Sequence, residues 1–322
     1  MLLARLVAGL VSLCMIAATA GMAIGQSYPN KSIRIVTSEP GGGADLVARI
    51  AAQGLTAVLG HPVIVDNRGG SAVIPAEIVA KAPPDGYTLS VSGNTTWLLP
   101  FLQENVPYDP LRDFSLISLT TSSPAVLAVH PSVAANSVKE LIALAKARPG
   151  ELNYASGTLG STTHLATELF RVMADINIVR VPYKGAGPAL IALGAGQVQF
   201  MFFPASSGTP HIKAGRVKGL AVASAQPTAL APGLPTVTAS GLPGYESGTF
   251  HVVFAPARTP EVIIARLNQE IVRYINRAEV KDKLFNSGLD IVGGSPKQSA
   301  ATMKAEMVRM GKVIKDAGIK GE

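Results

Sequence analysis

The chain has 322 residues, of which 48% are hydrophobic and 15% charged, and its formal net charge is +7. This composition excludes a disordered chain, and the length suits two lobes rather than a single core. The basic residues are scattered and are not interleaved with aromatic ones, which argues against a nucleic-acid groove and against a nucleic-acid partner.

The N-terminus predicts export from the cytoplasm. Arg5 precedes an uncharged run, LVAGLVSLCMIAATAGMAIG, which ends in small residues before the polar QSYPNKS. Because this order is typical of a secretory signal, we expect residues 1–25 to be a signal peptide, cleaved after Gly25 or Ala20, and the mature protein to be periplasmic. The alternative is an uncleaved membrane anchor, since ~20 apolar residues span a bilayer. The one cysteine, Cys14, lies in this run, so a cleaved protein has no disulfide and no thiolate metal site.

Strand-like and helix-like segments alternate along the rest of the chain. In chain order, the pattern predicts strands at residues 33–37, 62–66, 87–93, 125–129, 152–156, 178–181, 198–203 and 220–224, and helices at residues 45–59, 76–82, 138–147, 162–173, 188–195, 260–275 and 296–317. Such alternation predicts an α/β fold with mostly parallel sheets flanked by helices. Each half of the chain opens with a strand, a glycine-containing turn and a helix, so we expect two similar lobes.

Two glycine-rich junctions, SEPGGGAD and SGTLGSTTH, each follow a predicted strand and precede a predicted helix. Unpaired N–H groups and the positive end of the helix dipole attract an anion at such a place. Ligands of open α/β sheets bind beyond the carboxyl ends of the strands, so the two loops are expected to form a clamp. The alternative is that the glycines only make tight turns. Neither loop matches a nucleotide-binding fingerprint.

The candidate ligand-binding residues come mostly from these junctions. They are Ser38, Glu39, Pro40, Gly41, Gly42, Gly43 and Asp45 in the first, Ser156, Thr158, Gly160, Ser161, Thr162 and His164 in the second, and Trp97, Tyr183 and Phe203 elsewhere. Asp45 also suits an N-cap or first-turn acid. Glu39 either receives an ammonium or hydroxyl group or points to solvent. Trp97 and Phe203 either make one end of the cleft aromatic or belong to the core, and Tyr183 either forms a wall or packs.

The histidines argue against an enzyme. None of the five has the spacing of a metal site such as His-Glu-x-x-His, and the chain lacks a Gly-x-Ser-x-Gly nucleophile elbow. Ser161 and His164 are three residues apart on one helical turn, but no third residue that orients the base can be identified. We therefore expect no catalytic residue, no metal and no cofactor.

The chain resembles the substrate-binding proteins of tripartite tricarboxylate transporters, often called the Bug family. The resemblance runs from about Tyr28 to Lys320 and rests on the order and spacing of YPNKSIRIV, PGGGAD, LGHPVIVDNRGG, PPDGYTL, VPYDPLRDF, ELIALAKARPGELNYASGTLGSTTHLATELF, VPYKGAGPALIALGAGQV, HIKAGRVKGLAV, LPTVTASGLPGYE, APARTP and KDAGIK. It implies a two-lobed periplasmic binding protein of the flytrap type. Lobe I is then residues 26–125 plus 250–322, and lobe II, with the crossover region, is residues 126–249.

The same resemblance implies the function. A monomer captures a small carboxylate between its lobes and delivers it to the membrane subunits of the transporter. The SEPGGGAD junction corresponds to the family's first loop, and the SGTLGSTTH junction to its main carboxylate-gripping loop. The alternative function is that of a sensor component that presents the bound carboxylate to a membrane signalling protein.

Overall fold

The computed structural model describes residues 28–38, 40–69, 73–316 and 318–319. Its strands are β1 (Ile33–Thr37), β2 (Val63–Asn67), β3 (Thr88–Gly93), β4 (Phe114–Val129), β5 (Asn153–Ser156), β6 (Val179–Pro182), β7 (Phe200–Pro204), β8 (Lys218–Val222), β9 (Gly248–Pro256) and β10 (Asp290–Ile291). Its helices are α3 (Gly43–Leu59), α4 (Val73–Ala80), α5 (Thr95–Leu98), the 3₁₀ helix η1 (Leu99–Phe101), α6 (Val138–Ala147), α7 (Thr162–Ala174), α8 (Ala186–Gly194), α9 (Ala205–Lys213), α10 (Glu261–Ile275), α11 (Ala278–Asn286) and α12 (Pro296–Asp316). The fold is α/β, as the sequence predicts.

Short-range chemistry sets where the long helices begin and end. Ser137 caps α6 by accepting a hydrogen bond at 3.2 Å from the backbone N–H three residues on. Ser161 caps α7 in the same way through the N–H of His164. Helix α3 ends at Gly60, whose φ of +71° is left-handed backbone that glycine adopts without strain. These residues mark the ends of the helices through contacts with their own neighbours in the chain.

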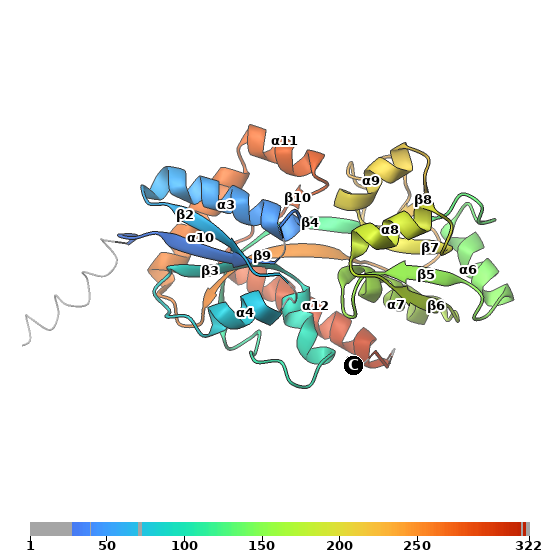
Figure 1. Ribbon diagram of the computed structural model, residues 1–322, viewed down its shortest axis with the longest axis horizontal. Coiled ribbons are helices and arrows are strands. Elements are labelled where there is room, and N and C mark those ends of the chain that lie inside the picture. Colours follow the sequence, from blue (N-terminus) through green and yellow to red (C-terminus); the bar gives the residue numbers. More distant parts are fainter. Residues whose placement is uncertain (1–27, 39, 70–72, 317, 320–322) are drawn as a thin grey trace, which may run out of the picture.

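Strand β4 joins two half-sheets. Its residues 114–124 pair antiparallel with β9, which continues through β3 and β1 to β2; we call these strands the first half-sheet. Its residues 125–129 pair with β7 and β8, and β7 continues through β5 to β6; these form the second half-sheet. The pairings of β1 with β2 and β3, and of β5 with β6 and β7, are parallel, so the sheet is mixed. The two half-sheets lie side by side, with β4 and β9 running through the middle (Figure 1).

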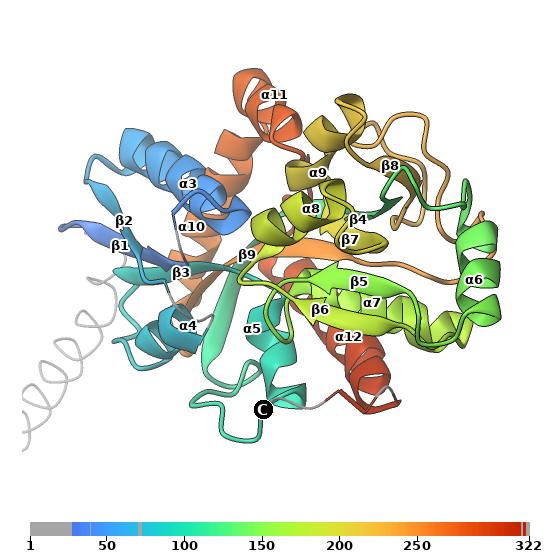
Figure 2. The same cartoon turned by 45° about the vertical axis from the view of Figure 1, so that its right-hand side comes forward.

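Helix α12 ties the two half-sheets together from one side. It packs against β4, α5 and α7, and in Figure 2 it runs behind α5 and past α7. Its residues Met303, Met310 and Ile314 belong to a hydrophobic core that also contains Trp97 and Phe170, one from each half of the molecule. Two further cores lie within single halves, one between α3, α10 and the first half-sheet and one under α8 and α9.

The structure contains elements that the sequence pattern did not indicate. β4 is 16 residues long, whereas only residues 125–129 are predicted, because the rest of the strand is rich in Ser and Thr. Most of these hydroxyl-bearing residues are buried, and Thr120 Oγ1, for example, donates to the carbonyl of His251 at 2.8 Å. β9, α9 and α11 are also additional to the prediction. Across the described ranges no helix combines the length and hydrophobicity of a membrane span; the predicted signal peptide lies outside these ranges.

Candidate functional site

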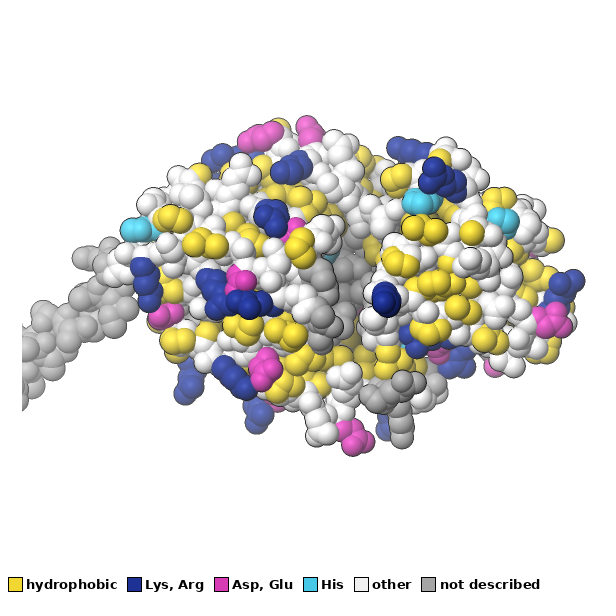
Figure 3. Space-filling model, in the orientation of Figure 1, with side chains coloured by type: hydrophobic (Ala, Val, Ile, Leu, Met, Phe, Trp, Pro, Cys, Tyr) yellow, Lys and Arg dark blue, Asp and Glu magenta, His cyan; other side chains and the backbone are white. Residues whose placement is uncertain are grey.

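A cavity of about 610 Å³ lies between the two half-sheets, where the surface of the molecule is hollowed (Figure 3). Its lining residues are Ser38, Ala44, Pro75, Ser92, Gly93, Asn94, Thr95, Thr96, Leu99, Gln103, Thr158, Leu159, Ser161, Thr162, Lys184, Gly185, Thr249 and His251. Hydroxyl and amide side chains dominate this set, and it includes no Asp or Glu among the residues that the structure describes. Its polar groups are therefore suited to a polar or anionic guest.

The first wall is the start of helix α3. Ser38 and Ala44 line the cavity, while Gly41 and Gly42 make the exposed turn between them. Gly41 has φ of +86°, and its N–H donates to Asp45 Oδ2 at 2.9 Å. The first N–H groups of a helix have no partner within it, so the end of α3 presents unpaired donors beside the cavity. The predicted first loop is thus at the cavity, although part of it faces solvent.

Asp45 shapes this loop and does not line the cavity. Besides the N–H of Gly41, its carboxylate accepts from Arg49 Nε at 3.0 Å and from Asn67 Nδ2 at 2.8 Å. Burial raises the pKa of Asp45, but these hydrogen bonds outweigh burial and hold the pKa below its ordinary value. The carboxylate is therefore neutralised by its own neighbours. Glu39, the other acid predicted in this loop, lies outside the described residues.

The second wall is the start of helix α7, where Thr158, Ser161 and Thr162 line the cavity. Gly160 turns the chain with φ of +72°, and its N–H donates to His164 Nδ1 at 3.1 Å. Because His164 uses Nδ1 for this bond and Ser161 Oγ accepts from the backbone N–H of His164, the two side chains do not form a nucleophile–base pair. Burial first, and the charge of Arg180 second, lower the pKa of His164 to about 4.

A third part of the wall was not predicted from the sequence. It is the β3–α5 junction, Ser92 to Thr96, together with Thr249 and His251 of β9. The signal was present in the sequence as SGNTT, which is a polar stretch after a buried strand like the other two junctions. The missing information was that β9 pairs with β3 and brings His251 beside Gly93.

Three buried side-chain oxygens in the described part of the chain have no hydrogen-bond partner: Asn94 Oδ1, Thr96 Oγ1 and Thr249 Oγ1. All three residues line this cavity. Unpaired buried polar groups are costly and few in native proteins, so their concentration beside one cavity distinguishes this part of the described chain. The orientation of Asn94 is fixed, because Nδ2 donates to Glu306 Oε1 at 2.8 Å and to the Gly248 carbonyl at 3.1 Å.

Several predicted residues do not line the cavity. Trp97 and Phe203 are fully buried, and the alternative that they belong to the core is the one the structure adopts. Trp97 donates from Nε1 to Glu306 at 2.9 Å, and Phe203 packs in the core under α8 and α9. Tyr183 is half-buried and packs against that same core. Ser156 is buried and accepts from Arg180 Nε at 2.8 Å.

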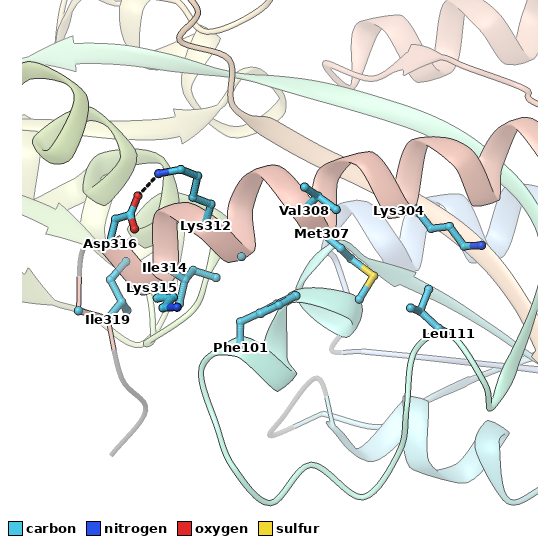
Figure 4. Close-up of a pocket in the computed structure, with 12 residues that line it drawn as sticks. Phe101, Leu111, Lys304, Met307, Val308, Lys312, Ile314, Lys315, Asp316 and Ile319 are labelled. Atoms are coloured by element: carbon cyan, nitrogen blue, oxygen red, sulfur yellow. Dashed lines mark hydrogen bonds and ion pairs between the residues drawn. The ribbon is translucent and has the colours of Figure 1, made fainter.

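A larger groove, of about 1020 Å³, lies on the outer side of α12. Figure 4 shows Phe101, Leu111, Met307 and Val308 along it, with lysines at its edge. The N-termini of α3 and α7 do not contribute to it, and its walls are mostly aliphatic or aromatic. We therefore assign the candidate ligand site to the cavity between the half-sheets. That cavity contains no cluster of His, Cys, Asp or Glu suited to a metal among the residues described.

Comparison with known proteins shows the family of the chain. Residues 47–319 match the family model described as tripartite tricarboxylate transporter family receptor. BugT of Bordetella pertussis is 34% identical over 310 residues, which cover 94% of this chain and 95% of BugT. The solved structure of R. palustris Rpa4515 with adipate has a TM-score of 0.83 at 35% identity, covering 92% of this chain and 100% of that one.

Two further structures share the fold. MatC from Rhodopseudomonas palustris with bound malate has a TM-score of 0.79 at 29% identity and covers 89% of this chain and 100% of its own. The periplasmic binding protein BugD has a TM-score of 0.79 at 28% identity, covering 92% and 100%. The predicted two-lobed periplasmic binding protein fold is confirmed. Because the family match spans most of the sequence, this chain belongs to the tripartite tricarboxylate transporter receptor family, known also as the Bug family.

Proposed function

We propose that the protein captures a small carboxylate in the cavity between its half-sheets and delivers it in the periplasm to the membrane subunits of a tripartite tricarboxylate-type transporter. The observation that carries this proposal is that the N-termini of α3 and α7 reach one cavity from opposite half-sheets. Each helix end combines unpaired N–H donors with a partial positive charge. Two such ends aimed at one space favour an anion.

The charge of the walls agrees with an anionic ligand. Lys184 reaches the cavity from the second half-sheet side and is exposed, so it remains available to a second carboxylate. The hydroxyls of Thr158, Ser161 and Thr162 add neutral donors on the same side. The similar solved structures of Rpa4515 with adipate and of MatC with bound malate both contain a dicarboxylate. A dicarboxylate of about four to six carbons is therefore the first class to test.

Binding and delivery are coupled by closure of the two lobes. A ligand stabilises the closed form only through contacts that the open form lacks, so it must touch both walls. The proposed lobes are residues 26–125 plus 250–322 and residues 126–249, which meet at β4 and β9. The closed monomer then presents to the membrane subunits a surface that the empty protein does not have.

A thermal-shift screen tests the binding step. The protein is expressed with its own N-terminus, and its mass shows whether residues 1–25 have been removed. It is then heated with succinate, malate, adipate, glutamate, nicotinate and the neutral amides of the same shapes. A ligand that binds only the folded state raises the Tm by mass action. We expect a shift with at least one acid and none with its amide.

A screen without any shift has two explanations, which mass spectrometry separates. The protein is denatured and the supernatant is searched for a small acid that was carried through purification. If one is found, the screen is repeated after refolding without it. If neither a carried acid nor a shift is found, the proposed function is wrong.

A further inference from the structure

His251 lines the cavity, with one ring nitrogen in hydrogen-bond contact and the other without a partner among the described residues. Its Nδ1 lies 3.0 Å from Thr121 Oγ1 on the neighbouring strand β4. Its Nε2 has no hydrogen-bond partner among the described residues. This nitrogen is still accessible to solvent. His251 lines the cavity, and its Nε2 faces Gly43 at the N-terminus of α3, the helix whose next residue, Ala44, also lines the cavity.

Thr121 determines which nitrogen of His251 carries the proton. The Thr121 hydroxyl is fully buried, and Nδ1 is its one hydrogen-bond partner in the described structure. If the hydroxyl donates to Nδ1, the proton of the neutral ring sits on Nε2 and the buried Thr121 hydroxyl hydrogen has its acceptor. If Nδ1 carried the proton, the Thr121 hydroxyl hydrogen would be left in the core without an acceptor, which is costly. The ring is therefore an Nε2–H donor.

Gly43 keeps this donor uncovered. A Cβ at position 43 would lie 2.7 Å from His251 Nε2 and 2.9 Å from Cε1, which is closer than real side chains approach. Gly43 is the first residue of α3, so the unpaired N–H groups of that helix end lie beside the same nitrogen. The third glycine of SEPGGGAD therefore leaves room for the imidazole ring at the anion-binding end of α3.

We propose that His251 is a ligand-binding residue whose Nε2–H donates to a carboxylate oxygen of the bound acid, with Thr121 as the residue that positions the proton. The inference rests on the proposed function, because it assigns one contact within that site. The neutral ring orients the ligand through a directional hydrogen bond. The helix ends and Lys184 stabilise the negative charge of the ligand. Neither His251 nor Thr121 belongs to the two glycine-rich junctions.

Isothermal titration with succinate, malate, adipate and glutamate tests the contact in four variants. His251→Phe removes the donor and keeps a ring, and Gly43→Ala keeps the histidine but places a methyl group against Nε2. Both variants are expected to lower the affinity for the acid that binds wild-type protein by about tenfold or more. The controls are His61→Phe, which lies away from the cavity, and Gly187→Ala, where an added Cβ meets nothing within 4 Å. Both controls are expected to bind within about twofold of wild type.

Nitrogen NMR of the imidazole ring reads the proton position without any variant. The expected result is a neutral ring protonated at Nε2 whose Nε2–H signal moves downfield when the acid is added. Thr121→Val is expected to mix the two tautomers and to weaken binding several-fold while the protein stays folded. A ring protonated at Nδ1 in the wild type overturns the role of Thr121.

The outcomes separate this inference from the proposed function. If the wild type binds an acid and both His251→Phe and Gly43→Ala bind it equally well, the His251 contact is wrong and the proposed function stands. If His251→Phe does not fold, Gly43→Ala and the NMR measurement on the wild type still decide. If the wild type binds none of the acids and carries none through purification, the proposed function fails and this contact fails with it.

Discussion

Gly160, in the turn before α7, packs against Leu102, which follows η1 in the other half of the molecule. A Cβ on Gly160 would lie 2.5 Å from Leu102 Cδ1. Gly160 also has φ of +72°, which side-chain-bearing residues rarely adopt. This glycine therefore meets two requirements at once, a left-handed turn and a close approach between the halves of the molecule.

The first prediction separates these two requirements. Gly160→Ala should destabilise the protein and weaken acid binding, because the walls can no longer meet. Gly215→Ala is the matched control, since Gly215 has φ of +67° and open space around it. It should show only the backbone cost, on the order of 1 kcal/mol, and normal binding. Adding Leu102→Ala to Gly160→Ala should restore part of the affinity. Equal binding by Gly160→Ala and wild type would show that this contact is not needed for closure.

The second prediction concerns acid stability. Burial lowers the pKa of both His164 and His251 to about 4 in the folded protein, whereas a histidine in an unfolded chain titrates near ~6.5. The unfolded state therefore takes up protons first as the pH falls. Above about pH 7 these two histidines should make the free energy of unfolding independent of pH. Between about pH 6.5 and 4 each should lower the free energy of unfolding by roughly 3 kcal/mol.

Urea unfolding at several pH values checks this. His164→Gln should lower the slope of stability against pH in that window by about one proton, and His130→Gln, at an exposed position, serves as the control. An unchanged slope in His164→Gln would mean that His164 is not buried as a neutral ring. The burial of Glu306 raises its pKa, which gives a contribution of opposite sign, so variants should be compared only with each other.

The third prediction concerns Glu306, a buried residue of α12 whose carboxyl accepts hydrogen bonds from Asn94 Nδ2 and Trp97 Nε1. Glu306→Ala leaves the Trp97 indole N–H and one of the two Asn94 amide hydrogens without a partner, because only the bond from Asn94 Nδ2 to the Gly248 carbonyl remains, and each loss should cost about 1–3 kcal/mol. Glu306→Gln keeps one acceptor oxygen and should cost less. Denaturant unfolding measures both, with the exposed Glu279→Gln expected to change stability by no more than about 0.5 kcal/mol. If Glu306→Ala leaves the free energy of unfolding unchanged, this carboxyl does not stabilise the packing of α12.

The fourth prediction uses the unpaired hydroxyl of Thr96. Thr96→Val replaces a buried oxygen without a partner by a methyl group, so the empty protein should be as stable as wild type or more stable. If the ligand completes that hydroxyl, the same change should weaken acid binding. Thr167→Val is the contrasting variant, because the Thr167 hydroxyl donates to the carbonyl of Thr163 at 3.0 Å. Its loss should lower the free energy of unfolding by about 1 kcal/mol. A loss of stability in Thr96→Val as large as in Thr167→Val would show that its hydroxyl already has a partner.

Local signals predicted much of the fold. Helix α6 and strand β1 are found at their predicted positions, because apolar periodicity, the Ser137 cap and nearby Pro and Gly residues act within a few positions of the chain. Both glycine-rich junctions reach the cavity for the same reason: each stands between a strand and a helix. The motifs in their order also predicted the family.

Tertiary structure alone decided which residues share the cavity. Trp97 is aromatic and near the site in sequence, but its indole N–H finds Glu306, more than two hundred residues away, and the ring stays in the core. His251 is reached only because β9 returns beside β3, a pairing between strands far apart in sequence. The sequence by itself determined most of the strands and helices and the two glycine-rich turns, which depend on neighbours along the chain. The choice of wall residues depended on long-range pairing and packing, which no local pattern encodes.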